Sequence, residues 1–191
     1  MQADLKRVLL VGSAGIAQAV GKVCFAASAP TVRTPGARGQ LLFIVGSRAQ
    51  QSSEQVRRLL QAGAERFDAP NGAIAVEAVA KTKVPVLVVQ ACAAAREGDA
   101  VEVAARLAEG AAALLARGSI GALVATGGDT AIAILQRLGR STLRVIGTLL
   151  PGIPYSRIQG PAGELVFVTK AGGFGAPDAF EMIASRLRGA R

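Results

Sequence analysis

Three glycine-rich segments of the chain combine residue types that could bind a phosphorylated ligand. They are residues 45–49 (Val-Gly-Ser-Arg-Ala), 125–130 (Ala-Thr-Gly-Gly-Asp-Thr) and 169–175 (Thr-Lys-Ala-Gly-Gly-Phe-Gly), and each follows an apolar run. Such a pattern is typical of strand-to-helix turns at the carboxyl edge of a parallel sheet, where open α/β folds bind ligands. Glycine lets the backbone approach a ligand, and backbone N–H groups at these turns favour phosphate. Together the three segments indicate a nucleotide site.

The second segment places two glycines, an acid and a hydroxyl at the start of a predicted helix. Its candidate residues are Thr126, Gly127, Gly128, Asp129 and Thr130. In the functional interpretation, backbone N–H groups contact phosphate and Asp129 lies near a metal ion or a hydroxyl group. In the structural interpretation, the glycines form a tight turn and Asp129 is an ordinary N-cap. This segment alone leaves both interpretations open.

Lys170 follows a predicted strand and comes just before Gly172 and Gly173. We predict a phosphate or nucleotide role for these three residues, and the alternative is a solvated surface lysine beside a glycine turn. Ser47 likewise follows a predicted strand. Because Ser52 and Gln55 have the spacing of a capping box, the alternative for Ser47 is a plain turn before a capped helix.

Other catalytic signatures are missing from the sequence. No segment has the P-loop pattern, and residues 12–15 (Gly-Ser-Ala-Gly) lack the third glycine of a dinucleotide-binding fingerprint. The chain contains no histidine, which excludes a histidine-based triad or general base and, without a CxxC pattern, a zinc site. Cys24 and Cys92 lie in alanine-rich surroundings, so we expect reduced, structural cysteines and a reducing compartment.

The elements that must position these segments are indicated by composition and periodicity. The chain is 51% hydrophobic but only 4% aromatic, which suits a parallel sheet built from aliphatic strands and covered by helices. We predict an α/β fold, a layered parallel or mixed sheet flanked by helices in a single domain. The predicted strands cover residues 7–11, 41–45, 86–90, 120–125, 143–146 and 165–168. The predicted helices cover residues 14–25, 52–62, 73–80, 99–117, 129–138 and 177–187.

We divide the chain into an N-terminal strand-helix segment (1–29), a linker rich in proline and glycine (30–40) and a main domain (41–191). The formal charge of +9 raises the alternative of a nucleic-acid-binding protein. Because the arginines are scattered and aromatic residues are scarce, we expect no nucleic-acid partner. No apolar stretch reaches 18 residues, so we expect no membrane span and a cytoplasmic protein.

The ordered set of motifs resembles the C-terminal nucleotide-binding domain of the four-carbon acid sugar kinases. The segments that carry the resemblance are residues 10–17, 46–55, 125–131, 151–154 and 168–175. The resemblance implies a kinase that uses ATP and Mg²⁺ to phosphorylate the terminal hydroxyl of a four-carbon sugar acid. It also implies that Ser47, the loop from Gly127 to Thr130, and Gly172 with Gly173 line the ATP site.

Three departures from the family pattern affect this interpretation. Ala49 stands where the family usually has a second serine, and Thr148 stands where its members often carry an acid. The N-terminal domain that would hold the sugar acid is also absent from the sequence, so we expect an incomplete active site. A non-catalytic nucleotide- or anion-binding module is therefore the alternative function, and a homo-oligomer is left open.

Overall fold

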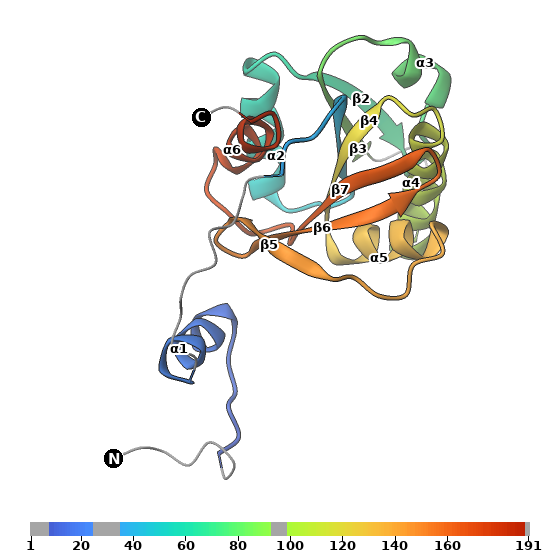
Figure 1. The fold of residues 1–191 in the computed structure, drawn as a ribbon. Coiled ribbons are helices and arrows are strands. Elements are labelled where there is room, and N and C mark those ends of the chain that lie inside the picture. Colours follow the sequence, from blue (N-terminus) through green and yellow to red (C-terminus); the bar gives the residue numbers. More distant parts are fainter. Residues whose placement is uncertain (1–7, 25–34, 93–98, 190–191) are drawn as a thin grey trace. The chain divides into compact units, whose positions relative to one another are not determined.

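The structure is a computed structural model of the 191-residue chain, and it describes residues 8–24, 35–92 and 99–189. The chain divides into two compact units, Met1–Arg33 and Thr34–Arg191 (Figure 1). The second unit contains the whole sheet and all the predicted site residues.

The first unit contains helix α1 (Ala14–Cys24), which agrees with the predicted helix as far as Cys24. Residues 8–11 are apolar but are not in a strand, and their side chains are 43–88% exposed. The strand predicted over residues 7–11 is therefore wrong for residues 8–11, because an apolar run forms a strand only where a neighbouring strand pairs with it. Arg7 and Phe25 lie outside the described residues.

The second unit is built on one mixed sheet whose strand order is β2-β3-β1-β4-β7-β6-β5. Its strands are β1 (Gln40–Val45), β2 (Glu65–Pro70), β3 (Val86–Cys92), β4 (Ile120–Thr126), β5 (Val145–Leu150), β6 (Ile153–Gly160) and β7 (Gly163–Lys170). The strands from β2 to β7 in this order pair in parallel, and β6 and β5 extend the sheet antiparallel. The predicted mixed α/β fold is confirmed.

The central strands are buried on both faces. Residues 41–45 of β1 and 122–125 of β4 have no exposed surface, which explains why both strands appear in the sequence as unbroken aliphatic runs. Edge strand β2 instead carries charged residues such as Arg66 and Asp68 and ends in Pro70. Charge and proline are usual on edge strands, but they hide the strand from sequence analysis.

Helices cover both faces of the sheet (Figure 1). Helices α2 (Gln50–Gln61) and α6 (Ala179–Leu187) pack on one face through Val56, Phe180 and Ile183. Helices α3 (Val76–Lys81), α4 (Ala100–Leu115) and α5 (Gly128–Arg137) pack on the other face. Each of α2, α4, α5 and α6 follows a parallel strand, so its N-terminus lies at the carboxyl edge of the sheet.

The start of α2 differs from the prediction. The helix begins at Gln50 with Ala49 as its N-cap, and no side chain caps it. Ser52 is the third residue of the helix, and its side chain and that of Gln55 bond to a distant loop. The predicted capping box is therefore wrong, because tertiary hydrogen bonds satisfy both side chains.

Several further elements differ from the sequence predictions. Helix α3 begins three residues later than predicted, and the strand predicted over residues 143–146 is β5, Val145–Leu150. Strand β6 was not predicted because Pro154, Arg157 and Gly160 interrupt its apolar pattern. Of the predicted linker, residues 35–39 are described and lie outside helices and strands, and Gln40 begins β1.

Candidate functional site

The three glycine segments follow the three neighbouring parallel strands β1, β4 and β7. At the centre of this group, between β1 and β4, the face of the sheet on which the following helix packs changes. Strand β1 continues into α2 on one face of the sheet, whereas β4 continues into α5 on the other face. Such a switch point opens a crevice outside the carboxyl ends of the two strands. The topology therefore confirms that the segments meet at one edge.

Backbone hydrogen bonds join the three turns directly. The N–H of Gly46 donates to the Thr126 carbonyl at 3.2 Å, and the N–H of Gly127 donates to the Lys170 carbonyl at 3.0 Å. These bonds carry the sheet ladder one residue beyond each strand. The next residues of the turns, Ser47 and Gly128, are the first beyond the ladder.

Glycine is required where the turns approach one another. A Cβ at Gly46 would overlap the Thr130 hydroxyl, and a Cβ at Gly172 would overlap the Ser47 hydroxyl. Gly127 has a φ of +106°, which side chains rarely adopt. A Cβ built on Gly127 would also stand 3.6 Å from the Ser47 nitrogen. The glycines thus keep the space between the β1 and β4 turns open.

Backbone N–H groups without a protein acceptor lie at these turns. Among the described residues, no protein acceptor bonds to the N–H of Ser47, Gly128 or Asp129. The last two belong to the first turn of α5, where helix geometry leaves N–H groups without an internal partner and concentrates partial positive charge. The Ser47 hydroxyl accepts a 3.2 Å hydrogen bond from the Ala49 N–H, which fixes its turn.

Ser47 and Asp129 line a cavity of about 280 Å³, and Gly128 lies between two of its lining residues in the chain. It is lined by Gly46, Ser47, Arg48, Ala100, Val103, Ala104, Gly127, Asp129 and Thr130. The lining includes the first turns of α4 and α5 and the residues that lead into α2, so the positive ends of three helices gather there. The shape and charge suit a chain of phosphate groups.

Within the described part of the chain, Asp129 is the one carboxylate that lines this cavity, and its side chain is exposed. The described residues include no group of three or more His, Cys, Asp or Glu side chains that could hold a metal ion by themselves. That composition is consistent with Mg²⁺, which commonly uses one or two carboxylates and completes its shell with substrate phosphates and water.

Two predicted site residues lie behind the cavity rather than in it. The Thr126 side chain is fully buried, and alternation along β4 places it on the α2 face of the sheet. Lys170 is 2% exposed, and its Nζ donates to the carbonyls of Ala171 and Gly172 at 2.9 and 3.0 Å. It also lies 5.4 Å from the centre of the Phe180 ring.

Burial lowers the pKa of the Lys170 ammonium from its ordinary 10.5 to about 8, because the charged form loses its hydration. The ion pairs among the described residues do not include Lys170. The structure thus places a buried cation beneath the glycine loop that follows β7, and carbonyl dipoles surround it.

Ser52 and Gln55 contribute to the site in a way that sequence analysis missed. Both are fully buried on α2, and both donate hydrogen bonds to carbonyls of the loop over residues 171–176. The sequence signal was present, since two buried polar residues on one helix face need partners. A capping box explained the same spacing locally and concealed the tertiary bonds.

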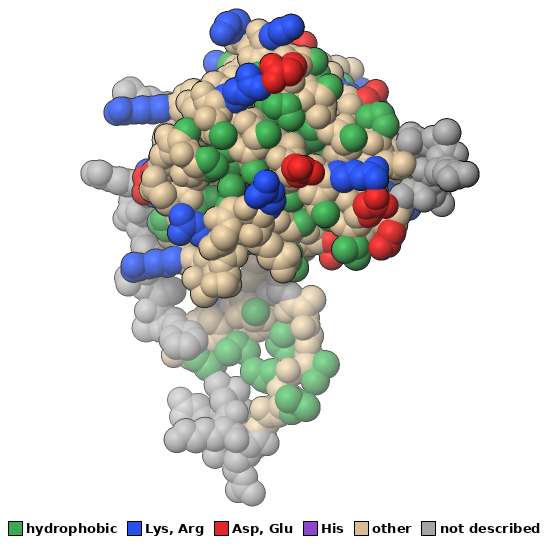
Figure 2. All heavy atoms as spheres, turned by 90° about the vertical axis from the view of Figure 1, so that its right-hand side faces the viewer, with side chains coloured by type: hydrophobic (Ala, Val, Ile, Leu, Met, Phe, Trp, Pro, Cys, Tyr) green, Lys and Arg blue, Asp and Glu red, His purple; other side chains and the backbone are tan. Residues whose placement is uncertain are grey.

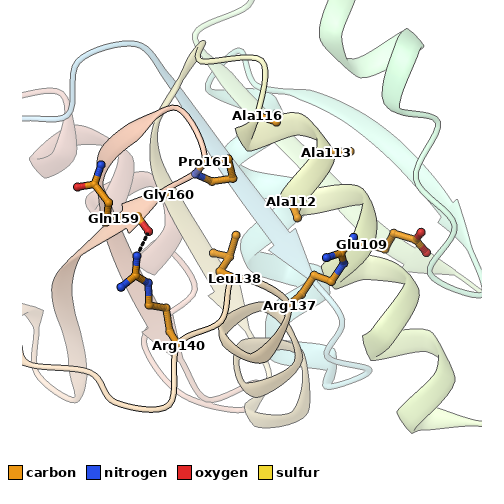
Figure 3. A pocket seen from close by; sticks show the side chains of 10 residues that line it. All are labelled: Glu109, Ala112, Ala113, Ala116, Arg137, Leu138, Arg140, Gln159, Gly160 and Pro161. Carbon is orange, nitrogen blue, oxygen red and sulfur yellow. Dashed lines mark hydrogen bonds between the residues drawn. The ribbon is translucent and has the colours of Figure 1, made fainter.

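A larger cavity, of about 570 Å³, lies at the opposite edge of the sheet (Figure 3). It is lined by the C-terminal halves of α4 and α5 and by the β6–β7 turn. Arg137 reaches toward α4, and Arg140 donates to the Gln159 carbonyl at 2.9 Å. Helix C-termini carry partial negative charge, which these arginines complement. This cavity therefore suits a polyanion less well than the cavity among the glycine turns.

The positive charge of the chain is distributed over the surface. Figure 2 shows basic and acidic side chains interspersed on the face that it presents. Arginines form ion pairs with acids at Glu54–Arg57, Arg58–Glu181, Arg66–Asp68, Glu102–Arg106, Glu77–Arg117 and Arg157–Glu164. No described helix is long and apolar enough to cross a membrane.

Comparison with known proteins identifies the family. Residues 42–180 match the model of the nucleotide-binding C-terminal domain. A D-threonate kinase of Bordetella bronchiseptica is 34% identical over 96% of this chain, and a 3-oxo-tetronate kinase of Cupriavidus necator is 35% identical over 86% of it. The chain belongs to the family of C-terminal nucleotide-binding domains of the four-carbon acid sugar kinases.

A solved structure agrees with this assignment. The crystal structure of a domain of unknown function from B. bronchiseptica, a domain-swapped dimer with bound citrate, superposes with a TM-score of 0.70 at 33% identity. The match covers 80% of this chain and 42% of that one. The chain likewise spans 47% and 41% of the two kinases, so it corresponds to less than half the length of these relatives.

Proposed function

We propose that the chain binds ATP with Mg²⁺ at the carboxyl edge of β1, β4 and β7. The observation that carries the proposal is that, among the described residues, the N–H groups of Ser47, Gly128 and Asp129 have no protein acceptor, and that Ser47 and Asp129 line one cavity. The bound nucleotide would supply the transferable γ-phosphoryl group, and Mg²⁺ would neutralise charge on its phosphates. In this proposal, the terminal hydroxyl of a four-carbon sugar acid receives the γ-phosphoryl group.

The residues of the chain would divide the work of binding. Ser47, Gly127 and Gly128 offer backbone and open space to phosphate oxygens, and the first turn of α5 directs its positive end at them. The Asp129 carboxylate, at the same helix start, is the group that would hold Mg²⁺ beside those phosphates. The buried Lys170 ammonium and the helix dipoles would act by position, which is most of what phosphoryl transfer requires.

The sugar acid itself belongs, in this proposal, to an N-terminal domain. The matched relatives are more than twice the length that this chain covers. Residues 1–29 would form the end of that domain or its docking segment. A homo-oligomer is a further proposal, supported by the domain-swapped dimer named for the B. bronchiseptica structure.

Titration calorimetry with ATP and Mg²⁺ tests the proposal, using Gly128→Val as the variant. A Cβ at Gly128 meets no atom within 4 Å, and its φ is unrestricted, so the fold should tolerate valine. Its methyl groups would occupy the open space before the α5 donors. Loss of one hydrogen bond to a charged group is worth about 1.5–3 kcal/mol, which predicts a roughly 10- to 150-fold weaker affinity.

Gly36→Val is the matched control, because a Cβ at Gly36 also meets no atom within 4 Å. Gly36 lies just before β1, at the amino edge of the central strands, and the control should bind ATP like the wild type. Equal ATP affinities of folded Gly128→Val and wild type would refute the placement of the phosphates. Absence of ATP binding by the wild-type chain would refute the proposal altogether.

A non-catalytic nucleotide- or anion-binding module is the second candidate function. It is favoured by the described lining of the cavity, which includes one carboxylate and, in a chain without histidine, no imidazole to accept a proton. Turnover of threonate or erythronate in the presence of a separately produced N-terminal domain would support the kinase. ATP binding without turnover under the same conditions would support the module.

A further inference from the structure

The loop that follows β7 is attached to α2 by its carbonyl oxygens. Ser52 Oγ donates to the Gly172 carbonyl at 2.8 Å. Gln55 Nε2 donates to the carbonyls of Phe174 and Ala176 at 3.1 and 2.9 Å. Two side chains of one helix therefore hold a loop that lies about 120 residues further along the chain.

The side chains that hold the loop are buried, and they reach it from two directions. Ser52 and Gln55 have no exposed surface, and their spacing of three residues places them on the same face of α2. From β7, Lys170 Nζ donates to the carbonyls of Ala171 and Gly172. Hydrogen bonds that are shielded from water in this way fix a loop more firmly than exposed ones.

The orientation of the carbonyls determines where the N–H groups of the loop point. In a planar trans peptide, the C=O of one residue and the N–H of the next point in opposite directions. Since the Gly172 carbonyl points to Ser52, the Gly173 N–H points away from α2. Lys170 Nζ bonds to the Ala171 carbonyl, so by the same rule the Gly172 N–H points away from Lys170. Among the described residues neither N–H has a protein acceptor.

We infer that Ser52 and Gln55 are positioning residues: they fix the loop over residues 171–176 by its carbonyls, so that its N–H groups are presented to the phosphates of a nucleotide. This inference rests on the proposed function. The contact between the Gly172 backbone and Ser47 places the loop directly against the β1 turn. Neither side chain lines the cavity, so both act through the backbone.

Ser52→Ala and Gln55→Met test this role, and Ser53→Ala is the control. Ser53 is the adjacent residue of α2 and is exposed, so the control makes the same chemical change on the solvent face. Methionine has nearly the shape of glutamine, and the buried Gln55 Oε1 has no hydrogen-bond partner to lose. Both variants should therefore fold.

Two measurements are made at a temperature where every variant is fully folded. Amide hydrogen exchange of the peptide covering residues 171–176 should become at least about tenfold faster in Ser52→Ala and Gln55→Met. Their affinity for ATP with Mg²⁺ should fall about tenfold, as expected for losing one or two hydrogen bonds. Ser53→Ala should match the wild type in both.

The two measurements separate the inference from the proposed function. Unchanged loop exchange in both variants would overturn the inference, and so would unchanged ATP affinity with a wild type that binds ATP. If the wild type does not bind ATP, the proposed function fails and the ligand-directed inference fails with it. Faster loop exchange would then show only that the two side chains hold the loop.

Discussion

Lys170 gives the stability of this protein a dependence on pH that the structure predicts in sign and size. The ammonium is 2% exposed and has no carboxylate partner among the described ion pairs. The groups that face it are two loop carbonyls and the ring of Phe180 from α6. The nearest ion pair of α2 and α6, Arg58–Glu181, is partly exposed to solvent. Burial therefore dominates and lowers the pKa of Lys170 to about 8.

The sign follows from proton binding. Between pH 8 and 10.5 the unfolded chain keeps the Lys170 proton whereas the folded chain releases it, so the free energy of unfolding rises with pH. Below pH 8 both states are protonated, and the folded state carries the full cost of a buried charge. The difference between the two pKa values corresponds to about 3 kcal/mol. Stability is thus lost as the pH falls from 10.5 through 8.

Lys170→Met is the perturbation, because methionine removes the charge and retains the length of the side chain. The two carbonyls keep other donors, the Phe174 N–H at 3.1 Å and Ser52 Oγ at 2.8 Å, so the variant should fold. The free energy of unfolding is measured by urea denaturation from pH 7 to 11. From pH 8 to 10.5 the wild type should gain about 3 kcal/mol relative to the variant.

Subtracting the variant from the wild type cancels the titration of all other groups that the substitution leaves unchanged. Lys83→Met, at an exposed position, is the control, and its difference from the wild type should stay flat across the range. A flat difference for Lys170→Met would refute the reasoning, since it would show that the ammonium is solvated in the folded chain. A difference that moves in favour of the variant would contradict the sign.

The remaining predictions concern the glycine turns and the reaction. Gly46→Ala should lower stability by about 1–3 kcal/mol, because its Cβ overlaps Thr130 and lies 3.1 Å from Leu107; thermal unfolding should show it, with Gly36→Ala unchanged. The isolated chain should not phosphorylate threonate or erythronate, because positioning of the acceptor contributes roughly 7–11 kcal/mol to lowering such a barrier. A matching N-terminal domain added in trans should restore transfer, and steady turnover without it would contradict this.

The fold was predictable where one local pattern determines structure. The sequence predicts β1, β3 and β4 from their aliphatic runs and α4 from its apolar face. Strand β6 and edge strand β2 could not be predicted from the sequence. Their residues do not follow a regular apolar pattern, because pairing with neighbouring strands determines where these strands form. Residues 8–11 show the reverse case, in which strand-like residues form no strand without a partner.

The candidate site, too, could be predicted from the sequence only in part. The glycines correctly marked the turns, because the backbone conformation or the close approach of the turns requires them at Gly46, Gly127 and Gly172. Their role in nucleotide binding stays a prediction. Side chains were less reliable. Lys170 was predicted to meet phosphate and is buried beneath the loop, and the hydroxyl of Thr126 faces away from the cavity. We propose that both residues act on the nucleotide through the backbone and the electric field rather than by side-chain contact.

A phosphate site made of backbone N–H groups depends on where the carbonyls are held. The sheet ladder uses the N–H of Gly46 and of Gly127, so the first unused donors are those of Ser47 and Gly128, one residue further along. After β7 no strand continues the ladder, and side chains of α2 hold the loop carbonyls instead. Substitutions behind the turns should therefore change ligand affinity as much as substitutions in the cavity. In the proposed site, the side chains of Ser52 and Gln55, which the ligand would not contact, hold the donors of the loop in place.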